Sequence, residues 1–181
     1  MTGKKVIVIP DGKICDYIDG KQRNDTPEEY VRQTIEKRLV NEHKYIPDQI
    51  KIEYTLQVGS SKPRADIVIW AKGESEQTQG NAKLIIECKK ENVDARNAKD
   101  GIAQLQSYMS VCPNCEWGMW TNSVQKYVFR KAVDDSGNIT FMEYNDIPAA
   151  DGNLDEVNRP SRTGLKNAYD DNLLFVFINI D

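Results

Sequence analysis

The sequence has few cysteines and histidines and lacks a long apolar run. Four cysteines and one histidine occur in 181 residues, which is too few cysteines for a small secreted disulfide scaffold. No segment approaches the ~20 consecutive apolar residues that a transmembrane helix needs. The apolar segment near the N-terminus is too short for a signal peptide and is interrupted at Pro10 and Asp11. We therefore expect a cytoplasmic protein without a membrane partner.

The cysteines also give little support for a zinc site. Cys112 and Cys115 have the spacing of half a zinc site, but a structural zinc ion needs two further ligands. Cys15, Cys88 and His43 do not form a second pair with suitable spacing. We expect two reduced cysteines in a turn and no bound zinc.

The chain has no excess of basic residues and no phosphate-binding loop. Its formal net charge is −4 and its isoelectric point is near 5.2, which counts mildly against a nucleic-acid partner because such proteins are often basic. Affinity depends on a local basic track, however, so the total charge does not exclude such a partner. The absence of the pattern G-x-x-x-x-G-K-[ST] indicates that these residues contain no nucleotide site.

What the sequence does contain is the pattern of an α/β domain. A chain of 181 residues, 39% of them hydrophobic, is long enough to bury one core. We expect a single domain over residues 1–181, with a core at about 26–131 and a C-terminal extension at about 146–181. The apolar run at 173–180 is either a terminal strand or a sign that the chain is part of a longer protein, and both interpretations stay open.

Hydrophobic periodicity and turn residues predict the secondary structure. Thr26 as N-cap, Pro27 at the first helical position and acidic residues in the first turn predict a helix that ends at about 41–45. A loop is predicted at 19–25 and a second helix at about 98–111. Strands are predicted at 4–9, 13–18, 50–58, 64–70, 83–90, 117–121, 124–130 and 139–144. The central order of helix, three strands, helix and two strands predicts a mixed β-sheet flanked by α-helices.

The strand at 83–90 ends in a carboxylate and an ammonium group. Glu87 and Lys89 point to the same face because side chains alternate along a strand, and Leu84, Ile86 and Cys88 occupy the other, buried face. Asp66 lies in the preceding strand, and in a hairpin it would approach Glu87 within ~5 Å. This pattern indicates either a surface ion pair on an edge strand or a catalytic site.

Two adjacent carboxylates need a cation, and oxygen ligands of this kind suit Mg²⁺ or Mn²⁺. Asp66, Glu87 and the backbone carbonyl of Cys88 are the candidate metal ligands. Lys89 would position or deprotonate the attacking water, or would stabilise the charge that develops at phosphorus. This arrangement favours metal-assisted hydrolysis of a phosphodiester bond.

At these positions the chain resembles the PD-(D/E)XK nuclease superfamily, and within it the N-terminal nuclease domain of type I restriction enzyme R (motor) subunits. The resemblance extends from about residue 15 to 130 and depends on the order and spacing of five segments, with Ala65 in place of the superfamily's proline. These segments are Thr26–Gln33, Arg64–Val68, Leu84–Lys89, Gln104–Tyr108 and Gly118–Asn122.

The resemblance implies a restriction-endonuclease-like core and a Mg²⁺-dependent DNA nuclease with Asp66, Glu87 and Lys89 as the catalytic set. It also implies auxiliary roles for Gln104 and Tyr108, which correspond to the family's Q-x-x-x-Y motif and share one helix face. An exposed glutamine and a half-buried tyrosine without such a role are the alternative.

The superfamily's first helix often contributes a further acid, and Glu36 is our candidate metal ligand, with a simply solvated side chain as the alternative. Basic residues near the site form either a DNA track or an ordinary solvated surface. These residues are Arg64, Lys90, Lys62, Arg96 and Lys99.

The implied substrate is double-stranded DNA, and the implied partners are a translocase and the methylation and specificity subunits. The alternative function is a non-cleaving module that binds DNA or a partner subunit through the same fold. A purely structural role would require the three catalytic residue types to coincide by chance.

Overall fold

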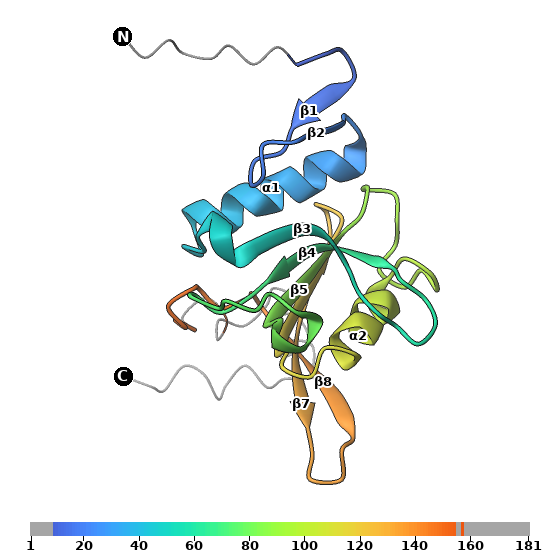
Figure 1. Ribbon diagram of the computed structural model, residues 1–181. Helices are drawn as coiled ribbons and strands as arrows, with labels where there is room; N and C mark the ends of the chain where they lie inside the picture. The colour runs from blue at the N-terminus through green and yellow to red at the C-terminus, as the bar shows by residue number, and fades with distance from the viewer. Residues whose placement is uncertain (1–8, 155–156, 158–181) are drawn as a thin grey trace, which may run out of the picture.

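The computed structural model describes residues 9–154 and 157, and Figure 1 shows its arrangement. Among these residues the helices are α1 (Pro27–Asn41) and α2 (Ile102–Ser110), with short 3₁₀ turns η1 (Pro47–Gln49) and η2 (Gln79–Asn81). The strands are β1 (Lys13–Cys15), β2 (Gln22–Asn24), β3 (Ile50–Thr55), β4 (Arg64–Ile69), β5 (Leu84–Cys88), β6 (Trp117–Thr121), β7 (Lys126–Val133) and β8 (Ile139–Tyr144). No helix in the described part of the chain is long and apolar enough to cross a membrane.

Six of the described strands form one mixed sheet in the order β3-β4-β5-β6-β7-β8. Strands β5 and β6 are parallel, and the other neighbouring pairs are antiparallel. A parallel pair requires a crossover connection, which α2 provides here. The predicted order of elements and the mixed sheet flanked by helices are therefore confirmed, and the architecture is consistent with a restriction-endonuclease-like fold.

Helix α1 covers one face of the sheet (Figure 1). The predicted N-cap is present, because Thr26 Oγ1 accepts a hydrogen bond from the Glu29 backbone N–H at 3.2 Å. The four-residue spacing of Val31, Ile35 and Leu39 places these side chains on the buried side of the helix, where they join the hydrophobic core of this face. The sequence signals for this helix were local, and the structure agrees with them.

Helix α2 packs on the opposite face of the sheet, against β5 and β6 (Figure 1). Leu105 and Met109 are fully buried and belong to a second core layer with Val68 and Ile85. Gly118 in β6 allows this close approach, because a Cβ atom at that position would collide with the Met109 side chain. The central strands are consequently buried on both faces.

Several predicted boundaries were wrong at the N-terminal end. The strand predicted at 13–18 stops at Cys15, because the Asp16 carboxylate accepts hydrogen bonds from the backbone N–H groups of Ile18 and Asp19 and turns the chain. The predicted loop at 19–25 contains β2, which pairs with β1. The predicted elements at 4–8 and 173–180 lie outside the described residues.

Three further boundaries differ from the prediction. Helix α2 begins at Ile102 and not near residue 98, because Asn97 Oδ1 accepts from the N–H groups of Lys99 and Asp100 and forms a competing turn. The strand predicted at 50–58 ends at residue 55, since the chain then turns through a bridge between Val58 and Ser61. Strand β7 covers 126–133 because β8 continues its pairing to residue 133.

Candidate functional site

Glu87 lies at the end of a strand in the interior of the sheet. Helices α1 and α2 cover both faces of the sheet at this strand, and all five residues of β5 are buried. Glu87 is 0% exposed and Lys89 is 8% exposed. A surface ion pair on an edge strand is therefore excluded, since β5 lies between β4 and β6.

The antiparallel pairing of β4 with β5 brings Asp66 to Glu87, as predicted for a hairpin. The Asp66 backbone N–H donates to Glu87 Oε1 at 3.2 Å, and the Cys88 backbone N–H donates to Asp66 Oδ2 at 2.8 Å. Lys89 Nζ lies 2.7 Å from Glu87 Oε2 and 3.6 Å from Asp66 Oδ2. The structure thus brings Asp66, Glu87 and Lys89 together and fixes both carboxylates through backbone N–H groups.

Burial changes the pKa of each member of this group. Burial and the neighbouring Asp66 raise the pKa of Glu87 to about 8, although Lys89 opposes the shift. Burial likewise raises the pKa of Asp66. Burial alone would lower the pKa of Lys89, but the carboxylates of Glu87 and Asp66 outweigh it and raise that pKa. The site therefore favours a protonated lysine and, without another cation, a proton on the carboxylate pair.

A pocket of about 460 Å³ opens onto this group between the start of α1, strands β3 and β4, and helix α2. Gln104 and Tyr108 line it, as their common helix face predicts, and Gln104 Nε2 donates to the Tyr108 hydroxyl at 2.9 Å. Gln104 Oε1 is buried and has no hydrogen-bond partner among the described residues. Gln104 is thus half-buried in the pocket wall, and the alternative interpretation of an exposed glutamine was wrong.

The structure places Glu36 outside the pocket wall, beneath it and beside Arg32 and Asp16. The acids of α1 that line the pocket are Glu28 and Glu29. Burial and the neighbouring Asp66 raise the pKa of Glu28, so this carboxyl is electrostatically coupled to the site. The position of Glu36 gives its predicted role as a metal ligand no support, and that role stays a prediction.

Sequence reasoning missed four charged residues of the pocket wall. Glu28 and Arg32 are four residues apart on α1, and this spacing could have indicated a shared face toward the site. Arg23 of β2 and Glu53 of β3 also line the pocket. Nothing in their local sequence marks them, because they reach the site through contacts between distant segments.

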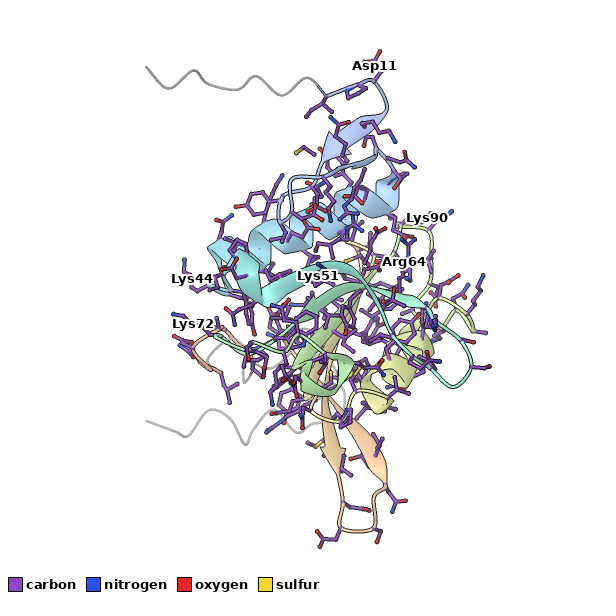
Figure 2. All side chains as sticks on the ribbon, viewed as in Figure 1. Asp11, Lys44, Lys51, Arg64, Lys72 and Lys90 are labelled. Carbon is purple, nitrogen blue, oxygen red and sulfur yellow. The ribbon has the colours of Figure 1, made fainter. Side chains whose placement is uncertain are left out.

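The basic residues proposed for DNA lie at the surface of this region. Arg64 lines the pocket with a side chain that is 63% exposed, and Lys90 directly follows the site (Figure 2). Lys62, Arg96 and Lys99 are exposed in the two connections that flank these strands. Their role as a basic track for DNA stays a prediction.

Metal coordination is limited by the number of acidic groups. Among residues 9–154 and 157, no group of three or more histidine, cysteine, aspartate or glutamate side chains lies close enough to share a metal ion. A metal at this site would therefore use two carboxylates and other oxygen donors.

In the buried turn at Cys112 and Cys115, the Lys131 ammonium donates to the Cys112 carbonyl at 2.6 Å.

The six-stranded mixed sheet with helices on both faces is consistent with a restriction-endonuclease-like α/β fold. A family model described as type I restriction enzyme R protein N terminus (HSDR_N) matches residues 27–148, which is more than half of the 181 residues. The chain therefore belongs to this family, as its motifs predicted. Comparisons with curated proteins and with solved structures gave no match.

Proposed function

We propose that this chain is a metal-dependent endonuclease module that hydrolyses phosphodiester bonds in double-stranded DNA. Membership of the family supports a nuclease module in general. The observation that supports the specific reaction is the group formed by Asp66, Glu87 and Lys89, in which Asp66 and Lys89 line an open pocket and the buried Glu87 contacts Lys89. In a complete restriction system its partners would be a translocase and the methylation and specificity subunits.

The residues present fit Mg²⁺ or Mn²⁺. The two carboxylates and the Cys88 carbonyl are oxygen donors, which hard divalent cations prefer. The raised pKa values of Asp66 and Glu87 indicate that this buried pair lacks sufficient positive charge, although Lys89 lies beside it. A bound Mg²⁺ would polarise the phosphate and acidify a water molecule.

The side chains have separate tasks in this proposal. Asp66 and Glu87 would hold the cation, and their hydrogen bonds to backbone N–H groups keep both carboxylates in position. Lys89 is protonated at neutral pH because its pKa is raised. Its ammonium group is therefore better suited to orient the attacking water or to stabilise charge at phosphorus than to act as a base. Gln104 and Tyr108, which also line the pocket, would contact the DNA.

Plasmid cleavage in Mg²⁺ or Mn²⁺ tests this function. We expect Asp66→Ala and Lys89→Ala each to reduce the cleavage rate by about a hundredfold or more, because the first removes a ligand of the cation and the second removes an ammonium group beside the reacting phosphate. Lys51→Ala is the matched control, since Lys51 is an exposed residue of β3 (Figure 2) and its loss should leave cleavage unchanged. Calorimetry with Mn²⁺ adds a measurement that does not depend on activity, and Asp66→Ala should abolish binding.

The outcomes separate the candidate functions. Unchanged cleavage in both site variants would remove the catalytic assignment. If no variant and no wild-type protein cleaves DNA or binds Mn²⁺, the non-cleaving module becomes the better description. Circular dichroism of each variant shows whether a loss of activity reflects a loss of fold.

A further inference from the structure

Three arginine side chains from separate elements converge on one carboxylate in the pocket wall. They come from β2, α1 and β4, and they line the same pocket as the catalytic group. The Nη1 atom of Arg23 lies 2.8 Å from a carboxylate oxygen of Glu53, and the corresponding distances are 3.7 Å for Arg32 and 3.5 Å for Arg64. The carboxylate thus occupies the point toward which three permanent positive charges are directed.

Other carboxylates pair with two of these guanidinium groups through their Nε and Nη2 atoms. Asp16 lies 2.6 Å from Nε of Arg23, and Asp19 lies 2.9 Å from its Nη2. Glu29 pairs with Nη2 of Arg32. These contacts leave the Nη1 atoms of both arginines directed toward Glu53, so the positions of both cations are fixed independently of any ligand.

Glu53 has an unusual backbone conformation for a strand residue. Its φ angle is +53°, in the left-handed region that residues with a side chain seldom adopt. The pairing of β3 with β4 continues on both sides of it, through Ile52 with Ile67 and Tyr54 with Ala65. The Glu53 side chain is 35% exposed, so its carboxylate can leave the arginines and enter solvent without crossing the core.

We propose that Arg23, Arg32 and Arg64 form a binding site for a backbone phosphate of DNA, and that the Glu53 carboxylate occupies this site in the DNA-free protein. A phosphodiester carries one negative charge, as a carboxylate does, and accepts hydrogen bonds from guanidinium groups in the same way. Exchange of one anion for the other keeps the arginines paired. The proposal rests on the proposed function for its choice of DNA as the ligand.

Removal of the Glu53 charge tests the proposal. Glu53→Gln keeps the shape of the side chain, and we expect it to bind a labelled DNA duplex about tenfold more tightly at low salt, because the phosphate no longer competes with a carboxylate. The measurement is fluorescence anisotropy in EDTA, where no cleavage occurs. Glu143→Gln is the matched control, since it changes the net charge equally but lies in β8, at the edge of the described sheet opposite β3.

A second variant tests the arginines directly. Arg64 is largely exposed, so Arg64→Gln should retain the fold. We expect weaker DNA binding and a salt dependence whose logarithmic slope is shallower by about 0.9, as expected for the loss of one phosphate contact. An unchanged slope would remove Arg64 from the site.

The results also separate this site from the nuclease function. Affinity of Glu53→Gln equal to or below that of the wild type, or an equal gain in Glu143→Gln, would overturn the proposal. A gain for inorganic phosphate in phosphorus NMR without a gain for DNA would assign the site to a free anion and would likewise refute it. Tighter DNA binding without plasmid cleavage would keep the phosphate site and reject the nuclease, whereas cleavage without tighter binding would do the reverse.

Discussion

The buried carboxyl group of Glu36 provides a quantitative test of the electrostatics beneath the pocket. Its side chain is 0% exposed, and neither carboxyl oxygen has a hydrogen-bond partner among the described residues. Arg32 Nε lies 3.4 Å from Oε1. Burial, followed by the charge of Asp16, raises the pKa of Glu36 to about 8, so most of this carboxyl is neutral at pH 7.

The raised pKa fixes the sign of the effect on stability. The folded state binds the proton more tightly than the unfolded state, in which the pKa is near 4.5. The stabilising contribution of the protonated Glu36 is therefore fully present below pH 4.5 and is lost as the pH rises through about 8. Between about pH 5 and about pH 8 the loss is ~3 kcal/mol, because one pKa unit corresponds to ~1.4 kcal/mol.

Urea unfolding of the wild type and of Glu36→Gln over this pH range measures the effect. Glutamine is neutral throughout, and the other titrating groups are common to both proteins. We expect the stability difference to shift by ~3 kcal/mol in favour of the variant as the pH rises. Parallel stability curves of the wild type and Glu36→Gln would refute the reasoning. Because Glu36 lies outside the pocket wall, its variant should bind Mn²⁺ as the wild type does, and a large loss would restore it as a candidate ligand.

Two further predictions concern the site and the core. Metal binding should tighten as the pH rises, because Mn²⁺ must displace the proton that the raised pKa of Glu87 keeps on the carboxylate pair. Calorimetry should show that the dissociation constant falls by up to about tenfold per pH unit below pH 8. A dissociation constant that does not change with pH would contradict this prediction. Gly118→Ala should reduce the free energy of unfolding by about 1–3 kcal/mol, because the added methyl group meets Met109 of α2. Thermal or urea unfolding measures this loss, and an unchanged stability would show that α2 can shift without cost.

The parts of the fold that could be predicted depend on local signals. The cap at Thr26 and the apolar spacing of α1 lie within one segment, so the helix could be placed from the sequence. The turn residues before β4 and the apolar run of β5 gave both strands, and their pairing brought Asp66 to Glu87. The group of Asp66, Glu87 and Lys89 was predictable because its members lie in or directly after two strands that are adjacent both in sequence and in the sheet.

The parts that could not be predicted depend on competition or on distant contacts. The start of α2 was misplaced because the Asn97 side chain stabilises a turn that periodicity does not reveal. Arg23 and Glu53 are 30 residues apart, and their contact follows from the packing of the β1–β2 hairpin beside the sheet. Glu36 was the candidate ligand because it lies next to the apolar stripe of α1, and the same position is the reason that the structure buries it beneath the pocket.

The charge balance of the site relates its two proposed ligands to each other. When ionised, Asp66, Glu87 and Lys89 carry a net charge of −1 in a buried environment, which is unfavourable without a further cation. A divalent cation would change this to +1, and one bound phosphodiester would restore neutrality. Glu53 would be the intramolecular anion that the phosphate replaces at the neighbouring arginines. Neither the metal nor the phosphate alone balances the charge of this group. Binding of one therefore reduces the electrostatic cost of binding the other, so we expect metal and DNA to bind with positive coupling.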